Sequence, residues 1–267
     1  MSSLDEVRAD LRDEHDALEE LLGDVDDNAW RRPTPSPGWV VADQVGHLAY
    51  FDHAAALAIS DPDLFAAHLR DLAAGAGEVG VDEFTLAHYR AMTPAELFGE
   101  WRVHRSALDL VATTLSEGQR VAWYGPEMSA TSFLGARLME TWAHGTDVAE
   151  ALEVDYPATP RLRHVARLGF VTRPWSYRVR GEEPPAGTVR VDLAGPDGDR
   201  WIFGELDAAD TVTGTARDFC LVVTQRRHLD DTDLVAGELG RHWLERAQAY
   251  AGPPSEGPPP KGRRGAG

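Results

Sequence analysis

Glu140 and His144 are four residues apart in a segment, 129–152, whose apolar spacing predicts a long helix. Four residues make about one helical turn, so both side chains project from one stripe and can hold the same ion. That stripe also carries Asp147 and is otherwise rich in alanine, which lets a neighbouring helix approach closely. Such pairs also occur on solvated helix faces, so the spacing leaves both interpretations open. An inward-facing stripe of charged groups would need a partner to offset its desolvation.

His47 offers that partner from a second predicted helix, 41–59, on a face that it shares with Phe51 and several alanines. Taken alone, His47 would be interpreted as a core histidine that is hydrogen-bonded to a carbonyl group. Together with Glu140 and His144 it completes two imidazoles and one carboxylate, which is the ligand set of an open catalytic metal site. Zinc fits these ligand types best, and nickel, iron or manganese would also suit them.

Other polar residues on the same helices are assigned supporting or structural roles. Asp43 and Asp147 are predicted to orient the imidazoles through their distal nitrogens, with plain exposed helix acids as the alternative. His53 lies six residues beyond His47 and therefore on a different helix face, so we expect that it is not a ligand. His104 occupies an apolar position and is interpreted as a core histidine.

The elements that must position these residues are long amphipathic helices. Their predicted ranges are 3–25, 41–59, 94–115 and 129–152. The third begins at a clear signal, because Thr93 and Glu96 can form a capping box with Pro94 at the first helical position. Residues 60–92 are expected to form one or two short helices, joined at the glycine-rich 74–77. Four long helices in about 150 residues predict a bundle.

The pattern changes after Pro157. Apolar and polar residues alternate over 189–193 and reappear at 201–203, across a Gly-Pro-Asp-Gly turn, which predicts a hairpin. A third strand is expected over 210–215, with helices over 161–177, 216–226 and 238–251. The predicted organisation is therefore a helical domain over 1–157, a smaller domain of helices and antiparallel sheet over 158–252, and a disordered Pro/Gly-rich tail over 253–267.

Composition excludes several classes of partner. The chain of 267 residues has a formal net charge of −18, which argues against nucleic acid and anionic membranes as partners. Its one cysteine, Cys220, excludes an internal disulfide framework and any cysteine-rich zinc site. Because the charged N-terminus lacks an apolar signal core and no stretch of 18 apolar residues occurs, we expect a cytoplasmic protein.

Several motifs resemble those of a known family. They are Gly38-Trp39, the run from Asp43 to Leu48, and the segments 123–126 and 136–148. Together they resemble an actinobacterial branch of the DinB-like superfamily, and in particular the mycothiol-dependent maleylpyruvate isomerases. The resemblance covers residues 1–252 and is most specific around Glu140.

This resemblance implies an N-terminal DinB-like four-helix bundle that binds one divalent metal through His47, Glu140 and His144. It also implies a smaller C-terminal domain of α/β type, similar to sterol carrier proteins, and mycothiol as cosubstrate. An arginine of that second domain binds the anionic substrate in the isomerases. Arg226 is the candidate here, with Arg227 beside it, because this chain has Gln225-Arg226-Arg227 where the isomerases have Gly-Arg.

Three functions follow as hypotheses. The first is a mycothiol-dependent isomerase or S-transferase in which the metal activates the cosubstrate thiol, and Trp39, Arg226 and Arg227 are the candidates to bind thiol or substrate. Cys220 lies among apolar neighbours and is expected to be buried, so the sulfur nucleophile would come from outside.

The second hypothesis is a metal-dependent hydrolase with Glu127, Asp147 or Asp43 as the base. The third is a non-enzymatic module that binds a metal and an apolar small molecule. For the enzyme we expect a small-molecule substrate, anionic if an arginine clamps it, and a monomer or homodimer.

Overall fold

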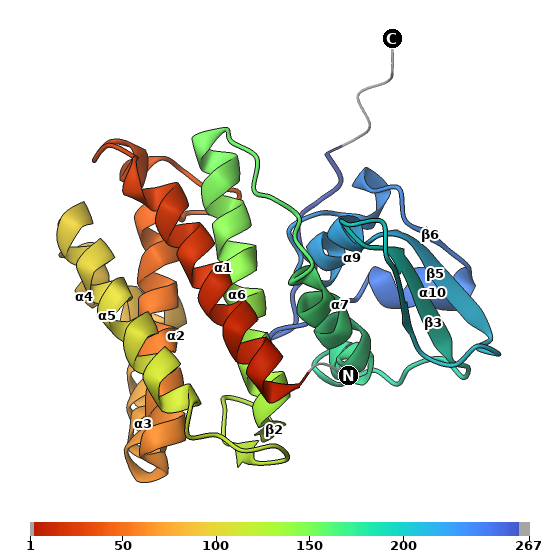
Figure 1. Ribbon diagram of the computed structural model, residues 1–267, viewed down its shortest axis with the longest axis horizontal. Helices are drawn as coiled ribbons and strands as arrows, with labels where there is room; N and C mark the ends of the chain where they lie inside the picture. The colour runs from red at the N-terminus through yellow and green to blue at the C-terminus, as the bar shows by residue number, and fades with distance from the viewer. Residues whose placement is uncertain (1–2, 262–267) are drawn as a thin grey trace. The chain divides into compact units, whose positions relative to one another are not determined.

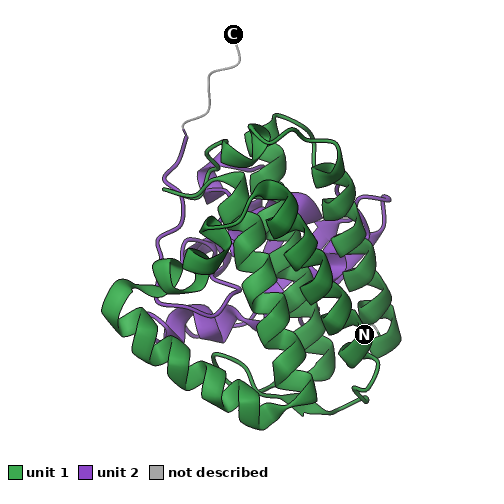
Figure 2. Ribbon diagram, turned by 90° about the vertical axis from the view of Figure 1, so that its left-hand side faces the viewer, with its two compact units in different colours: residues 1–156 green, residues 157–267 purple. Residues whose placement is uncertain are grey.

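The computed structural model describes residues 3–261, and the chain forms two compact units, Met1–Tyr156 and Pro157–Gly267 (Figures 1 and 2). The boundary lies one residue before the predicted one. The first unit is almost entirely helical. Its elements are α1 (Leu4–Gly23), the 3-10 helix η1 (Ala29–Arg31), α2 (Val41–Ser60), α3 (Pro62–Val79), α4 (Val81–Arg90), α5 (Pro94–Ala112), β1 (Arg120–Val121), β2 (Met128–Ser129) and α6 (Ala130–Leu152).

The four long helices predicted from the apolar spacing are present as α1, α2, α5 and α6. Helix α2 packs against both α5 and α6, and α1 packs against α6 and α5 (Figure 1). Helices α3 and α4 pack against each other and against α2. The apolar faces meet in a core that includes Leu18, Leu22, Val41, Val45, Leu48, Leu97, Trp101 and Val148. The helices that carry the candidate ligands, α2 and α6, are therefore held by the same core.

Two helix boundaries illustrate what the local sequence does and does not determine. The predicted capping box is confirmed, because Thr93 Oγ1 accepts from Glu96 N (3.3 Å) and Glu96 Oε2 accepts from Thr93 N (2.8 Å). The break expected at 74–77 is wrong, since α3 continues to Val79 and ends at Gly80, whose φ is +91°. A Cβ at Gly75 would lie 2.0 Å from the Phe84 ring. Glycine at this position thus permits close packing of α3 on α4 and does not end the helix.

A buried ion pair also joins α2 to α6. Arg137 donates from Nε (3.2 Å) and Nη2 (2.9 Å) to Asp52 Oδ1, and Trp101 Nε1 lies 3.3 Å from Asp52 Oδ2. Asp52 is fully buried, and the Arg137 side chain is 3% exposed. Because a buried charge needs compensation, this pair fixes how the two helices face each other.

The second unit combines a four-stranded sheet with short helices. Its elements are α7 (Leu162–Val171), α8 (Arg173–Arg178), β3 (Val189–Ala194), β4 (Arg200–Phe203), β5 (Asp210–Thr215), α9 (Ala216–Val223), η2 (Leu229–Asp231), β6 (Val235–Ala236) and α10 (Glu238–Leu244). The strand order is β4-β3-β5-β6, and the predicted hairpin is formed by β3 and β4. Helices α7 and α9 pack against each other, and α10 packs on β5 (Figure 1).

The expectation of a purely antiparallel sheet is wrong. β5 runs parallel to β3, with Val191 opposite Val212, while the β3–β4 and β5–β6 pairs are antiparallel. After β4 the chain crosses to the other edge of β3 and forms β5 there. Because β4 ends at the end of the sheet where β3 begins, β5 starts from that same end and runs parallel to β3. The alternation of apolar residues predicts which face of each strand is buried, but it carries no information about which strand lies beside it.

Part of the tail that we expected to be disordered makes hydrogen bonds within the second unit. Gln225 Nε2 donates to Ser255 O (2.9 Å), and Lys261 N donates to Asp231 Oδ2 (2.8 Å). Residues 253–261 are irregular backbone, and 262–267 lie outside the described residues.

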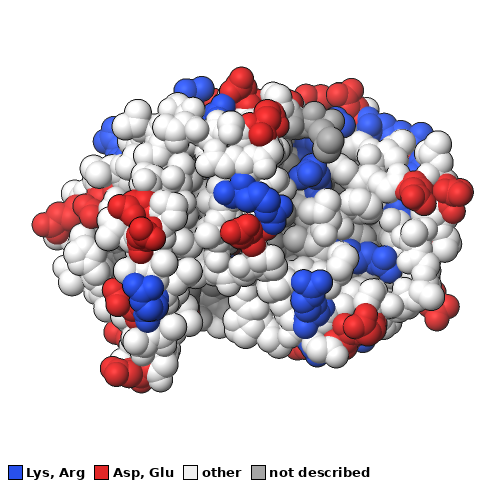
Figure 3. Space-filling model, turned by 90° about the horizontal axis from the view of Figure 1, so that it is seen from below, with Lys and Arg blue, Asp and Glu red and all other residues white. Residues whose placement is uncertain are grey.

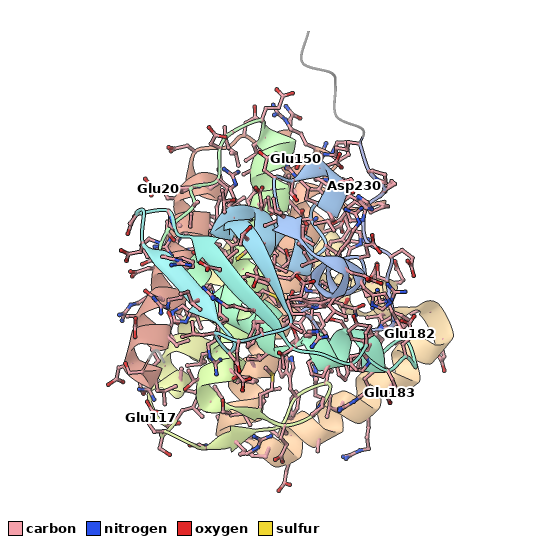
Figure 4. All side chains as sticks on the ribbon, turned by 90° about the vertical axis from the view of Figure 1, so that its right-hand side faces the viewer. Glu20, Glu117, Glu150, Glu182, Glu183 and Asp230 are labelled. Carbon is pink, nitrogen blue, oxygen red and sulfur yellow. The ribbon has the colours of Figure 1, made fainter. Side chains whose placement is uncertain are left out.

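Two of the acidic residues labelled in Figure 4 form ion pairs at the surface of the second unit. Glu182 pairs with Arg246 (2.7 Å), and Asp230 pairs with Arg241 (2.6 Å).

The surface charge and the character of the helices bear on which partners the chain can bind. On the face drawn in Figure 3, acidic and basic side chains are interspersed. In the described part of the chain, no helix combines the length and apolar character that crossing a bilayer requires.

Candidate metal centre

His47, Glu140 and His144 converge where α2 packs on α6. Glu140 Oε2 lies 3.2 Å from His144 Nε2 and 3.5 Å from His47 Nε2. One donor atom from each residue lies within 4.8 Å of the others, and the two imidazole centroids are 4.3 Å apart. The side chains of His47 and Glu140 are 19% and 21% exposed, and that of His144 is 7% exposed. The cluster is therefore largely buried but remains partly accessible to solvent.

The hydrogen bonds around His144 indicate which of its nitrogens carries the proton. Gln44 Oε1 lies 2.5 Å from His144 Nδ1, and Gln44 Nε2 donates to Thr34 Oγ1 (2.7 Å). With its NH₂ group directed to Thr34, Gln44 presents its carbonyl oxygen to the imidazole, so Nδ1 carries the proton. His144 Nε2 then directs a lone pair at Glu140.

This donor set fits a divalent cation. In the neutral imidazole, a lone pair on His144 Nε2 faces a carboxylate oxygen of Glu140, and the contact requires a proton or a cation between them. Desolvation opposes ionisation of Glu140, but hydrogen bonds and charge from His144 and His47 outweigh it and hold the pKa of this carboxyl well below its usual value. A carboxylate held in its ionised form suits a divalent cation. Two imidazoles and one carboxylate leave positions open for an exogenous ligand.

Aromatic side chains surround the two imidazoles. The Trp39 ring stacks on His144 with a centroid distance of 6.0 Å and an interplanar angle of 15°, and lies 5.4 Å from the His47 ring. Phe51 approaches His47 from the other direction along α2, at 4.5 Å. Trp39 is anchored in turn, since its Nε1 donates to Asp82 Oδ2 (3.1 Å). The structure therefore places Trp39, a predicted thiol- or substrate-binding residue, directly against the candidate ligands.

The two aspartates expected to orient the imidazoles have other hydrogen-bond partners. Asp43 Oδ2 accepts from Val40 N (3.0 Å) at the start of α2, and Asp43 Oδ1 accepts from Arg90 Nε (2.8 Å). Its carboxylate thus stabilises the helix end and pairs with α4, in contrast to the expectation. Asp147 Oδ2 accepts from Ser36 Oγ (3.1 Å), which ties the loop before α2 to α6.

Gln44 contacts the His144 imidazole through its side-chain oxygen, and the sequence interpretation missed it. It is fully buried among the apolar residues Val41, Val45 and Leu48 of α2. A polar amide on an otherwise apolar helix face was the available signal, because such a group must find a hydrogen-bond partner.

The remaining histidines and Glu127 have separate environments. His104 Nδ1 lies 2.9 Å from Ala49 O, as expected for a core histidine bound to a carbonyl, and its ring lies 4.9 Å from that of His53. Glu127, a candidate base for hydrolysis, is 64% exposed in the turn between β1 and β2 and lies 3.6 Å from Arg120. Neither histidine belongs to the metal-type cluster found among the described residues.

The candidate arginines follow α9 in the second unit. Arg226 N donates to Leu221 O (2.8 Å) and Gln225 N donates to Val222 O (3.0 Å), which is the hydrogen-bond pattern of a Schellman helix end. Gln225 has φ +57°, the left-handed conformation that glycine usually provides there. Arg226 Nη1 donates to Thr224 O (2.7 Å), and Arg227 lines a small surface crevice with Glu256.

Cys220 was predicted to be a buried thiol, and its burial is confirmed. It is fully buried in α9, and burial raises its pKa well above the usual value. Because thiolates are the reactive form, this residue is not suited to be a nucleophile.

The chain is similar in sequence to a known domain family and to two mycobacterial proteins. Residues 11–149 match the family model of the mycothiol maleylpyruvate isomerase N-terminal domain. Uncharacterized proteins from two strains of Mycobacterium tuberculosis are each 47% identical over 250 residues, covering 93% of this chain and 96% of the relative.

Crystal structures of the mycothiol-dependent maleylpyruvate isomerase and of a histidine-to-alanine mutant share the fold. Their TM-scores are 0.59 and 0.58 at 18% and 17% identity, and each match covers 88% of this chain and 93% of the other. By the match over more than half of its length, this chain belongs to the mycothiol maleylpyruvate isomerase N-terminal domain family.

Proposed function

We propose that this protein is a divalent-metal-dependent enzyme that uses mycothiol as cosubstrate, as an isomerase or an S-transferase acting on a small anionic molecule. The observation that carries the proposal is the shared contact of Glu140 Oε2 with Nε2 of both His47 and His144. A divalent ion, with zinc the best match to these ligands, would stabilise the thiolate form of the cosubstrate near neutral pH.

In this proposal the chain's own residues bind and orient the reactants. The thiolate adds to one carbon of an activated double bond, rotation follows, and elimination of the thiol restores the double bond in the other geometry. If another group leaves instead, the same attack gives S-transfer. Trp39 and Phe51 would shield the reacting sulfur from water on two sides of His47.

Arg226 is the residue we propose to bind the substrate carboxylate, and the helix end supports this choice over Arg227. Gln225 holds the left-handed position that glycine usually provides at a helix end, so the resemblance to the isomerases' Gly-Arg would make the next residue, Arg226, the counterpart of their arginine. A planar guanidinium can bind a carboxylate through two parallel hydrogen bonds.

The architecture and setting follow the same resemblance. We propose that α1, α2, α5 and α6 form a DinB-like four-helix bundle over 1–157, and that 158–252 form a sterol-carrier-like domain. A reducing cytoplasm would suit a thiol cosubstrate. Hydrolysis has less support as a function, because Asp43 is engaged by Arg90, Asp147 accepts a hydrogen bond from Ser36, and Glu127 is mostly exposed.

Metal analysis and thiol binding test the proposal together. The purified protein is expected to hold about one divalent ion per chain, and His47→Ala, Glu140→Ala and His144→Ala should each reduce that content. His53→Ala, a histidine on the same helix as His47, is the matched control and should retain the metal. Titration of the cobalt-substituted protein with mycothiol should produce a thiolate-to-cobalt absorption band.

Maleylpyruvate is the first substrate to assay with mycothiol, and Arg226→Lys should raise KM without changing the metal content. Equal metal content in the three ligand variants and the wild type would rule out the site. A metal-loaded protein that gives no band and no heat with mycothiol would rule out the thiol-dependent function.

A further inference from the structure

A fully buried glutamine on the inner face of α2 has both ends of its amide engaged. Gln44 Nε2 donates to Thr34 Oγ1 (2.7 Å), and Thr34 Oγ1 donates to Trp39 O (3.1 Å). Trp39 O also accepts from Thr34 N (2.8 Å), so the loop between η1 and α2 is closed on itself at this point. The Thr34 hydroxyl has one proton, and Trp39 O takes it. The hydroxyl oxygen can therefore only accept from the amide.

This chain of donors leaves the amide one orientation. With its NH₂ group toward Thr34, Gln44 presents Oε1 to His144 Nδ1 at 2.5 Å. An amide oxygen can only accept, so Nδ1 must donate and the Nε2 atom is left for ligation. The reversed amide would donate to Nδ1 and put the ring proton on Nε2, but it would also need the single Thr34 hydroxyl proton, which Trp39 O already accepts.

The same loop also covers the imidazole. Trp39 stacks on the His144 ring at 6.0 Å, so one residue of the loop packs on the ring while its carbonyl group anchors the Thr34–Gln44 pair. Rotation of the imidazole about its side-chain bonds would break the Gln44 contact and the stacking together. His144 is thus held in both tautomer and orientation by groups outside the ligand set.

We propose that Gln44 is a positioning residue that keeps His144 in the Nδ1–H tautomer and so presents Nε2 for metal binding, with Thr34 fixing the amide. The inference rests on the proposed metal site. A neutral amide donates less electron density through the imidazole than a carboxylate partner would. Gln44 therefore orients the ligand without making the imidazole more electron-rich. With an aspartate or glutamate in its place, the cation would be a weaker Lewis acid and would lower the pKa of a bound thiol less.

Two measurements test this inference. The first uses the Zn²⁺-loaded protein: nitrogen-proton correlation spectra should show His144 protonated at Nδ1 in the wild type and a mixture of Nδ1-protonated and Nε2-protonated forms in Gln44→Leu. The second is the dissociation constant for Zn²⁺ and Co²⁺. Gln44→Leu should weaken binding by about 10–100-fold, the usual effect of losing such a partner. Gln44→Glu should bind more tightly than the wild type.

Thr34→Val tests the anchor, and we expect weaker metal binding that lies between the wild type and Gln44→Leu. Thr85→Val is the control, because Thr85 is a buried threonine whose hydroxyl donates to carbonyl groups of its own helix, Val81 O (2.9 Å) and Asp82 O (3.4 Å). It should leave metal affinity unchanged. A purely structural role for Gln44 would lower the Tm of the metal-free protein with no change in affinity or tautomer.

Failure of this inference can be distinguished from failure of the proposed function. If the wild type binds no divalent metal, both are overturned. If the wild type binds metal and Gln44→Leu binds it within twofold with an unchanged tautomer, only the role of Gln44 is overturned. Weaker binding by Gln44→Glu than by the wild type would contradict the electronic part of the argument.

Discussion

Replacing Arg137 by leucine should destabilise the first unit strongly, because it leaves a buried charge without its main partner. Arg137 makes two hydrogen bonds to Asp52, and both side chains are almost inaccessible to water. Among residues 3–261, Trp101 Nε1 at 3.3 Å then remains as the hydrogen-bond donor to Asp52, with His15 Nε2 3.6 Å away. Breaking one side of a buried ion pair costs about 3–5 kcal/mol.

Thermal unfolding of the full chain measures this cost. In a unit of this size, each kcal/mol of lost stability lowers Tm by roughly 2–4 °C. Arg137→Leu should therefore lower the Tm of the transition in which the first unit unfolds by about 6–20 °C. The matched control is Arg102→Leu, which removes a 56% exposed arginine that pairs with Glu19 and should cost at most about 1 kcal/mol.

A double variant separates charge from packing. Asp52→Asn combined with Arg137→Leu removes both charges, keeps an acceptor for Trp101, and should recover most of the lost stability. If Arg137→Leu is as stable as Arg102→Leu, or if the double variant is less stable than Arg137→Leu, the buried pair does not control the contact between α2 and α6.

Three further predictions concern other parts of the chain. Bound Co²⁺ should quench tryptophan fluorescence through Trp39, which stacks on His144, and Trp39→Phe should reduce the quenching while Trp30→Phe should not. Desolvation opposes ionisation of Asp210, but backbone N–H groups around the start of α10 lower its pKa. The ionised Asp210 side chain therefore contributes its full stabilisation above about pH 4, near the pKa of an unfolded aspartate, and loses it as pH falls through the lower pKa of the folded state. When the free energy of unfolding is measured by urea titration at several pH values, Asp210→Asn should lack this loss at acid pH. The thiol of Cys220 should react with Ellman's reagent only after unfolding, and rapid reaction of the native protein would contradict its burial.

The candidate ligands could be predicted because their geometry is local or periodic. Glu140 and His144 share a stripe in any α-helix, whatever surrounds it. His47 could be added because its helix face is mostly apolar and must point inward. The helix start at Thr93 was predictable for the same reason, since a capping box involves only four consecutive residues.

Hydrogen-bond partners of the ligands could not be predicted in this way. Asp43 seemed suited to orient an imidazole, but the start of α2 and Arg90 engage it. Gln44 was overlooked because its partner is His144, 100 residues away. The parallel arrangement of β5 beside β3 was missed for a similar reason, since strand neighbours depend on how the chain crosses the sheet.

The sequence by itself determined the helical periods, their caps, the inward positions of the two histidines and Glu140, and the family motifs around them. These features depend on interactions within a few residues or on a face that must be buried. Tertiary structure alone decided that α2 and α6 pack together, that Glu140 Oε2 lies between two imidazoles, and that Gln44 Oε1 lies against Nδ1 of His144. Those outcomes require side chains from distant segments to meet at about 3 Å, and only the packed core fixes such distances.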